Sequence, residues 1–236
     1  SDVELVRAVV AANPRSVVVL VAGSAVVTSE WDTEVPAILL SWYNGMEGGH
    51  ALADLLLGAA NPGGRLPFVV PVDEADLPTF DAGATEFTYD GLHGQWFLDA
   101  NGTRPAHPFG FGLSYTRFDH AAERAERDGD DVVVRATTFN AGGRDGADVV
   151  QVYVTRPDAP GRARRRLGGF ARVEVGAGEA AEVTIRVPIR SLALRDTDTH
   201  SWVLPAGDYR FEVAHDAGDR SPLGVTLHLD EARWAR

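Results

Sequence analysis

Carboxylates that could act as acid/base catalysts are spread along this chain of 236 residues. Glu47 lies beside two glycines in a loop, where an acid/base residue could reach a substrate. The same position also directly precedes a helical pattern, and a carboxylate is stabilised at the positive end of a helix. The helix-start interpretation is the simpler one for Glu47. Asp54, farther along the same pattern, is interpreted as a helix-surface or packing residue.

A second group of candidates mixes polar side chains with aromatic rings. Residues 89–96 read Tyr-Asp-Gly-Leu-His-Gly-Gln-Trp. Sugar sites favour this mixture, because the CH faces of a sugar stack on rings and its hydroxyl groups need hydrogen-bond partners. Asp90, His93 and Trp96 are therefore the candidate substrate-binding residues. The alternative is that the segment serves as linker packing, without touching a substrate.

Other chemistries find little support. The seven histidines show neither an HExxH motif nor paired ligand spacing, so we predict no metal site. Asp196, Asp198 and His200 are interpreted as a solvated turn. Gly110 and Gly112 lack a third spaced glycine and open no helix, so no dinucleotide cofactor is expected.

Four arginines cluster within a short stretch of an acidic chain: Arg162, Arg164, Arg165 and Arg166. We interpret this cluster as a solvated loop between strands. The alternative is that it binds a neighbouring domain or an anionic ligand.

Composition narrows the classes of partner. The chain has 34 acidic and 22 basic residues, for a net charge of -12, so binding to nucleic acid is not expected. The longest apolar run, residues 17–27, is too short to span a bilayer, so no membrane partner is expected. The absence of cysteine excludes disulfides and thiolate chemistry. No compartment is predicted, because no signal peptide opens the chain and cysteine-free proteins occur inside and outside cells.

The first third of the chain alternates helix and strand patterns. A helix capped by Asp2 is expected to end at Asn13-Pro14. Strands are predicted at 16–22, 37–41 and 66–70, and a helix at 48–57. The first two strands are apolar runs of the kind that is buried on both faces. This alternation predicts a mostly parallel sheet with helices on both faces.

So few parallel strands do not make a stable sheet of this type by themselves. We therefore expect a segment preceding Ser1 to supply the missing strands.

The pattern changes to a period of two after Phe118. Seven short strands are predicted, at 131–139, 148–155, 170–175, 181–187, 201–204, 209–214 and 224–229. Turn residues separate them, which predicts an all-β sandwich of the immunoglobulin or fibronectin type III kind. The predicted domains are residues 1–117, with a loop-rich linker from about residue 77, and residues 118–236.

Several motifs occur in an order that identifies a family. They are Trp42-Tyr43-Asn44-Gly45-Met46-Glu47-Gly48-Gly49, Gly64-Arg65-Leu66-Pro67, Pro108-Phe109-Gly110-Phe111-Gly112-Leu113-Ser114-Tyr115-Thr116 and Ala147-Asp148-Val149-Val150-Gln151-Val152-Tyr153-Val154. With these motifs, essentially the whole chain resembles the C-terminal part of glycoside hydrolase family 3, of the β-glucosidase type. The resemblance implies the second half of the family's α/β sandwich domain, followed by its fibronectin type III-like domain.

The resemblance also implies an activity and its partners. Retaining glycosidases use two carboxylates, a nucleophile and an acid/base. In this family the nucleophile lies on an N-terminal (β/α)8 barrel, a fold of roughly 250 residues. The acid/base glutamate is implied to lie just before Ser1, so no catalytic residue is expected in this chain. The implied substrate is a terminal β-D-glucoside. A PA14-like insert and a homodimer are compatible with the resemblance.

Two alternatives stay open from the sequence. One is a non-catalytic carbohydrate-binding or scaffold module. The other is a β-xylosidase or arabinosidase of the same family, because residues that recognise the sugar lie mainly on the barrel. Since all basic residues are arginine, a GC-rich bacterial genome is the favoured source.

Overall fold

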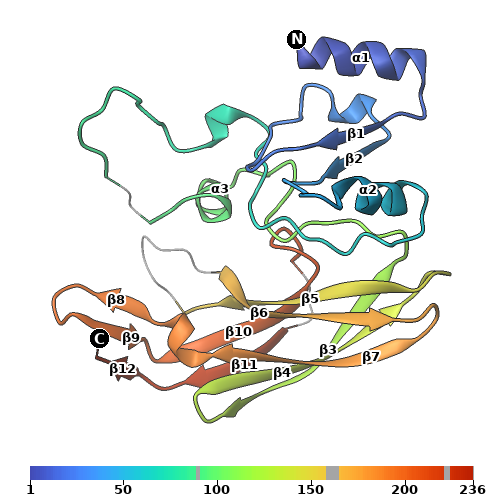
Figure 1. The fold of residues 1–236 in the computed structure, drawn as a ribbon. Helices are drawn as coiled ribbons and strands as arrows, with labels where there is room; N and C mark the ends of the chain where they lie inside the picture. The colour runs from blue at the N-terminus through green and yellow to red at the C-terminus, as the bar shows by residue number, and fades with distance from the viewer. Residues whose placement is uncertain (89–90, 158–164, 221–223, 236) are drawn as a thin grey trace. The chain divides into compact units, whose positions relative to one another are not determined.

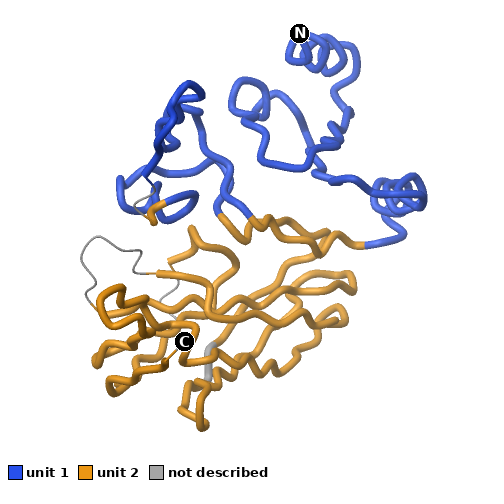
Figure 2. Tube along the Cα trace, turned by 60° about the vertical axis from the view of Figure 1, so that its left-hand side comes forward, with its two compact units in different colours: residues 1–60, 68–89, 93–108 blue, residues 61–67, 90–92, 109–236 orange. Residues whose placement is uncertain are grey.

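The computed structural model describes residues 1–88, 91–157, 165–220 and 224–235. The chain forms two compact units, shown in Figures 1 and 2. Unit 1 comprises residues 1–60, 68–89 and 93–108, and unit 2 comprises residues 61–67, 90–92 and 109–236. The short segment 61–67 therefore belongs to the sandwich unit, although it lies among residues of unit 1 in the sequence.

Unit 1 opens with helix α1, Asp2–Ala12. The Ser1 hydroxyl accepts a hydrogen bond from the Glu4 amide, and the Glu4 carboxylate accepts one from the Ser1 backbone nitrogen. This capping box makes Ser1 the N-cap, so the prediction of Asp2 as the cap was wrong by one residue. The helix ends where predicted, because Asn13 is extended before Pro14.

The sheet of unit 1 consists of β1, Val17–Leu20, and β2, Ala37–Leu40. The two strands are parallel, with Val17 opposite Ala37. The prediction of a third strand at residues 66–70 was wrong. Of these residues only Val70 forms a β-bridge, which is antiparallel and pairs it with His107. Pro67 has no amide hydrogen to give to a ladder, which disfavours a strand there. Among the described residues β1–β2 is the single parallel strand pair, and the other strand pairs are antiparallel. The prediction of a mostly parallel sheet is therefore not confirmed.

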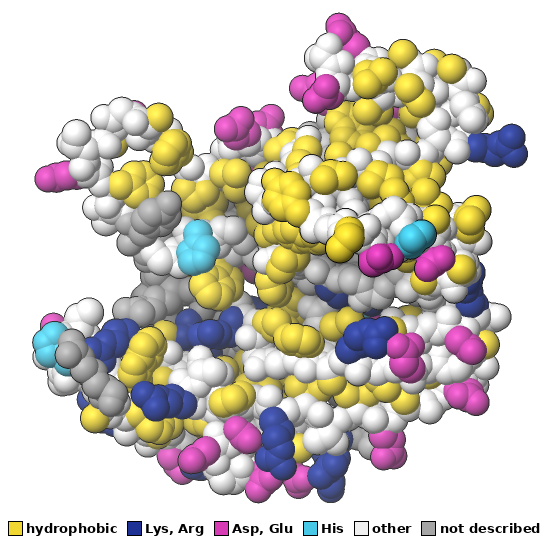
Figure 3. All heavy atoms as spheres, viewed as in Figure 1, with side chains coloured by type: hydrophobic (Ala, Val, Ile, Leu, Met, Phe, Trp, Pro, Cys, Tyr) yellow, Lys and Arg dark blue, Asp and Glu magenta, His cyan; other side chains and the backbone are white. Residues whose placement is uncertain are grey.

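Two more helices and two short 3-10 helices complete unit 1 in the part of the chain that the structure describes. They are α2 Gly48–Leu56, α3 Gln95–Asn101, η1 Asp32–Glu34 and η2 Glu74–Asp76. No residue of β1, β2 or α1 is buried, although the two strands were expected to be buried on both faces. Leu5 of α1 is 64% exposed. Hydrophobic side chains are conspicuous on the surface of this unit in Figure 3.

Unit 2 is an antiparallel sandwich. One sheet has the strand order β11-β10-β5-β6, the facing sheet has the order β3-β4-β7, and a small sheet has the order β12-β9-β8. The strands are β3 Phe118–Asp128, β4 Asp131–Asn140, β5 Gly146–Thr155, β6 Arg165–Val175, β7 Ala180–Pro188, β8 Leu194–Asp196, β9 Ser201–Leu204, β10 Gly207–Ala214, β11 Gly224–Leu229 and β12 Ala232–Trp234, with η3 at Ile189–Leu192. All seven predicted strands are present.

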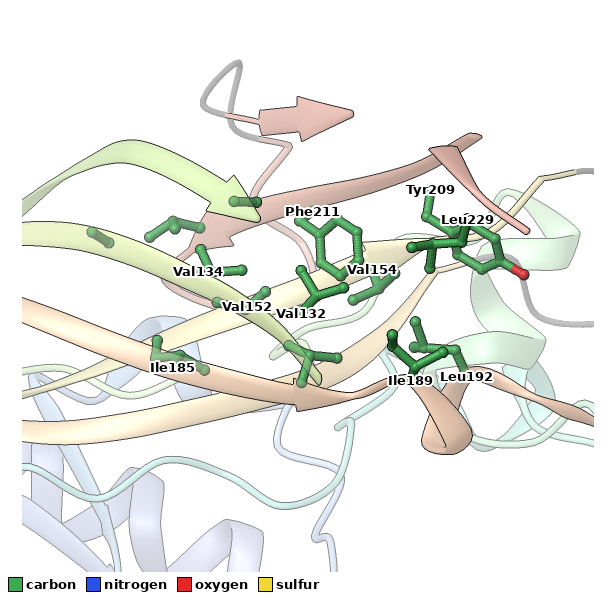
Figure 4. Close-up of a cluster of buried hydrophobic side chains, with 14 of the residues drawn as sticks. Val132, Val134, Val152, Val154, Ile185, Ile189, Leu192, Tyr209, Phe211 and Leu229 are labelled. Carbon is green, nitrogen blue, oxygen red and sulfur yellow. The ribbon is translucent and has the colours of Figure 1, made fainter. Parts of the chain in front are cut away.

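The core lies between the sheets of unit 2 (Figure 4). Along β7 buried and exposed residues alternate, as a half-buried strand requires. Fully buried side chains include Val132, Val152, Leu192, Tyr209 and Phe211. Burying each such side chain stabilises the fold by about 1.5–3 kcal/mol. This core positions the polar residues described below.

Strand β3 was not predicted. Its sequence, Phe-Asp-His-Ala-Ala-Glu-Arg-Ala-Glu-Arg-Asp, is rich in helix-forming residues. It is a strand because it pairs with β4 from Phe118 to Asp128, with a register shift between Ala122 and Arg124. Tertiary pairing thus overrides local propensity. None of the helices in the described part of the chain is long and apolar enough to cross a membrane.

Candidate functional site

Two of the three predicted substrate-binding residues lie together in unit 1. The rings of His93 and Trp96 meet edge to face, with centroids 5.4 Å apart. His93 is exposed and Trp96 is half-buried in the first turn of α3. Asp90 lies outside the described residues. The pair places an indole ring next to an imidazole. Contact of these two residues with a substrate remains a prediction.

Glu47 occupies the helix start, as the simpler interpretation held. It is the residue preceding α2, and its carboxylate contacts Nδ1 of His50 at 2.8 Å, with both side chains more than four-fifths exposed. Asp54 is exposed on α2. The turn at Asp196 is also confirmed, because its carboxylate accepts from the amides of Asp198 and Thr199.

Two segments of unit 2, residues 61–67 and 109–116, are bonded to each other, and we call them the strap. The Leu66 amide donates to the Phe111 carbonyl at 2.8 Å, and the Gly110 amide donates to the Leu66 carbonyl at 2.8 Å. The Asn61 side chain accepts from Ser114 Oγ at 3.0 Å and from the Tyr115 amide at 2.9 Å. Two of the four motifs that carried the family resemblance, residues 64–67 and 108–116, are thus joined by hydrogen bonds.

The strap lies directly on the sandwich. Gln151 of β5 donates to the Gly110 carbonyl at 3.0 Å, and the Tyr153 hydroxyl donates to the Phe109 carbonyl at 3.3 Å. Gly110 has a φ of 85°, and a Cβ at this residue would overlap Gln151 and Tyr153. A Cβ at Gly112 would overlap the Gly64 carbonyl. Gly110 thus allows the strap to pack closely on β5, and Gly112 allows the two segments of the strap to approach each other.

Replacing Gly110 by alanine is expected to loosen the strap. The left-handed backbone costs about 1–2 kcal/mol for a residue with a Cβ, and the overlap with Gln151 adds to this cost. Native-state hydrogen exchange should show a lower free energy of opening for strap amides, by about 2 kcal/mol. Gly64→Ala is the matched control, since a Cβ there meets nothing within 4 Å. Equal effects of the two substitutions would contradict the assignment.

A buried carboxylate links the strap to both sheets. Asp148 of β5 is fully buried and accepts hydrogen bonds from Nε2 of His120 on β3, at 2.6 Å, and from Oγ1 of Thr138 on β4, at 2.8 Å. Arg65 of the strap donates to its other oxygen at 3.4 Å. The ring of His120 stacks on that of His215, with centroids 4.0 Å apart. One carboxylate therefore joins three strands and the strap.

The electrostatics of this cluster follow from its contacts. Burial alone would raise the pKa of Asp148, but the hydrogen bond and charge of His120, the hydrogen bond from Thr138 and the charge of Arg65 together lower it. Burial also lowers the pKa of the Arg65 guanidinium, against the attraction of Asp148. Asp148 is thus held as a carboxylate although it is out of contact with water.

A second buried ion pair corrects the interpretation of the arginine cluster. Arg165 begins β6 and is only 8% exposed in its side chain. It contacts Glu212 of β10 at 3.1 Å, donates to the carbonyls of Ala217 and Asp219, and lies 4.2 Å from the centre of the Tyr153 ring. Its interpretation as a solvated loop residue was wrong. Arg162 and Arg164 lie outside the described residues.

The sequence carried one signal for these ion pairs. Asp148 and Glu212 interrupt the apolar runs of strands β5 and β10, most of whose residues are buried, and a buried charge needs a partner. Nothing local indicates that the partners are Arg65 and Arg165, which are far away in the sequence. Among the described residues no group of three or more His, Asp or Glu side chains is arranged to hold a metal ion.

Comparison with known proteins identifies the family. Residues 1–115 match the Glycosyl hydrolase family 3 C-terminal domain, and residues 148–217 match a Fibronectin type III-like domain. The chain belongs to glycosyl hydrolase family 3. It corresponds to the C-terminal part of the family's β-glucosidases, as the sequence motifs indicated.

Relatives of this family 3 chain come from fungi and bacteria. Beta-glucosidase B of Emericella nidulans is 35% identical over 93% of this chain, which spans 28% of that protein. Exo-alpha-(1->6)-L-arabinopyranosidase of Bifidobacterium breve is 33% identical over 97% of this chain, which spans 31% of it.

A solved structure shows the same fold at similar identity. The structure of beta-glucosidase 3B from Thermotoga neapolitana in complex with glucose is 31% identical, with a TM-score of 0.87. It covers 99% of this chain, and this chain covers 34% of it. The chain thus spans about a third or less of the relatives named here.

Proposed function

We propose that this chain is the C-terminal part of a retaining exo-β-glycosidase, a β-glucosidase that hydrolyses terminal β-D-glucosyl residues. The observation that carries the proposal is the similarity to β-glucosidases along nearly the whole chain, at 31–35% identity. The nucleophile and the acid/base lie on segments outside this chain, an N-terminal barrel and the region just before Ser1. The chain contributes a wall of the cleft and the stabilising sandwich.

The exposed strands of unit 1 support a role as part of a larger sheet. Strands β1 and β2 carry apolar residues that are half-buried or exposed, and α1 has no buried residue. Such a two-stranded sheet is marginal by itself. In the proposed assembly, further segments of the rest of the polypeptide pair with β1 and β2 and bury exposed apolar residues of α1, such as Leu5.

Three finer assignments belong to this proposal. His93 and Trp96, with Asp90, border the sugar pocket and contact the substrate. The boundary between the domains lies near residue 118, where β3 begins. A PA14-like insert and a homodimer are compatible partners, and the arginine-only basic residues favour a bacterial source.

A second candidate function is a pentosidase of the same family. The observation that favours it is the 33% identity to the arabinopyranosidase of Bifidobacterium breve over 97% of this chain. A β-xylosidase or arabinosidase would use the same two carboxylates and the same C-terminal part. The two candidates differ in the sugar that the barrel recognises.

The proposal predicts that residues 1–236 alone are inactive and that a polypeptide extended upstream through the barrel is active. Hydrolysis of p-nitrophenyl β-D-glucoside, β-D-xyloside and α-L-arabinopyranoside would be measured for both. We expect no rate above buffer for the isolated chain, and preference of the extended polypeptide for the glucoside. Turnover of a glucoside by the isolated chain at enzymatic rates would refute the proposal. Preference for a pentoside would favour the second candidate.

A further inference from the structure

Two histidines form a stacked pair beside the buried carboxylate of unit 2. The His120 and His215 rings have centroids 4.0 Å apart and planes inclined by 28°. The His120 side chain is only 3% exposed. His215 follows β10 and keeps part of its surface exposed to solvent, although neighbouring atoms partly desolvate its ring. The accessible histidine thus covers the buried one.

This pair does not accommodate two protons without cost. Nε2 of His120 is committed to Asp148, and its Nδ1 is buried without a hydrogen-bond partner in the described part of the chain. Protonation of both rings would place two positive charges face to face, partly shielded from water. A proton on His215 therefore works against the stack through the charge of His120.

The surrounding charges come from several elements. They are Asp148 on β5, Arg65 on the strap, and Asp216 and Asp219 on the turn after β10. Burial and the charge of His120 lower the pKa of His215, while the three carboxylates act in the opposite direction and do not fully compensate. Asp148 also accepts hydrogen bonds from Arg65, Thr138 and His120.

The sign of the pH dependence follows. The folded turn binds the proton of His215 less well than an unfolded chain does. The stability that the neutral stack gives is therefore present above about pH 6.5, the ordinary pKa of histidine, and is lost as the pH falls below it.

The turn that carries His215 is bonded to the strap. Gln151 donates to the His215 carbonyl as well as to the Gly110 carbonyl, so one side chain holds both segments. The Ala217 amide donates to the Phe109 carbonyl at 2.8 Å. A displacement of residues 215–217 would therefore break the hydrogen bond of Ala217 to the strap and the contact of Gln151 with the His215 carbonyl. The strap would then be held on the sandwich by Gln151, Tyr153 and Arg65.

From this geometry we propose that the stacked pair of His120 and His215 is an acid-operated latch. With neutral His215 the latch holds the turn 215–219 and the strap on the sandwich. In mildly acidic solution His215 leaves the stack, the turn moves away from β5, and the strap loosens while the two sheets stay folded.

Hydrogen exchange of the intact polypeptide that contains residues 1–236 tests the latch. Protection would be measured for peptides covering 61–67, 109–116 and 215–219 at about pH 7.5 and pH 5.5, corrected for the intrinsic pH dependence of amide exchange. Because the folded turn binds the proton of His215 less well than the unfolded chain does, we expect strap opening to rise severalfold in acid. Peptides of β4 and β7 should change by less than about twofold.

Two variants separate the latch from a general effect of acid. His215→Gln removes the titrating ring from an exposed site and should abolish most of the pH dependence of strap protection. His228→Gln is the matched control, because His228 is an exposed histidine paired with Asp208 at 2.9 Å, and it should behave as the wild type. The proposal is overturned if wild-type strap protection is the same at both pH values. It is also overturned if His215→Gln keeps the full response, or if β4 and β7 lose protection equally.

Discussion

Asp148→Ala is expected to lower the free energy of unfolding of the sandwich by about 3–5 kcal/mol, the usual cost of removing one partner of a buried ion pair. The carboxylate is fully buried and receives hydrogen bonds from His120, Thr138 and Arg65. Without it, three donors on three different elements lose their acceptor. Native-state hydrogen exchange of amides in β4 and β5 provides the measurement.

A matched control is the exposed pair of Asp208 and His228, where the aspartate side chain is 72% exposed. Asp208→Ala should cost less than about 1 kcal/mol, because surface ion pairs contribute little. The pH dependence gives a further check. Since the folded pKa of Asp148 is lowered, its contribution is present above about pH 4 and is lost as the pH falls through the folded value. Equal costs for the two substitutions would refute the central role of Asp148.

Residues with strong local patterns were placed correctly from the sequence alone. Strand β7 was predicted within one residue at each end, since its buried and exposed residues alternate. Helix α1 ended where Asn13-Pro14 required it. Strand β3 was missed because a run rich in Ala, Glu and Arg reads as helix until its partner β4 is known. A local sequence pattern thus predicts those elements that can be recognised without knowing which strand they pair with.

The buried polar sites were harder to predict for a related reason. Asp148 was noticed as a motif residue, but its partner Arg65 is 83 residues away in the sequence and directly precedes the strand that was predicted at residues 66–70 of the other domain. Arg165 was placed in a solvated loop because three of its neighbours are also arginines. Which arginine of such a cluster is buried depends on the sheet register, which no local pattern specifies.

Arg165→Met is expected to destabilise the sandwich by about 3–5 kcal/mol, because it leaves Glu212 buried, with a side chain only 9% exposed. The substitution also removes hydrogen bonds to the carbonyls of Ala217, at 2.7 Å, and Asp219, at 2.9 Å. The flexible thioether can still pack against the Tyr153 ring. Exchange of β5 and β6 amides measures the change in free energy.

The double variant Arg165→Met/Glu212→Gln distinguishes a true pair from two independent residues. If the charges compensate each other, the double variant should be less destabilised than the sum of the single variants by about 1–3 kcal/mol. The exposed pair of Arg172 and Glu174, also on β6, has side chains 57% and 69% exposed and should give additive effects. Additivity at Arg165 and Glu212 would show that the two side chains stabilise the sandwich independently. Coupling between the two charges would instead show that they act as a pair. This ion pair and the Asp148 cluster would then both belong to the rigid surface that holds the strap.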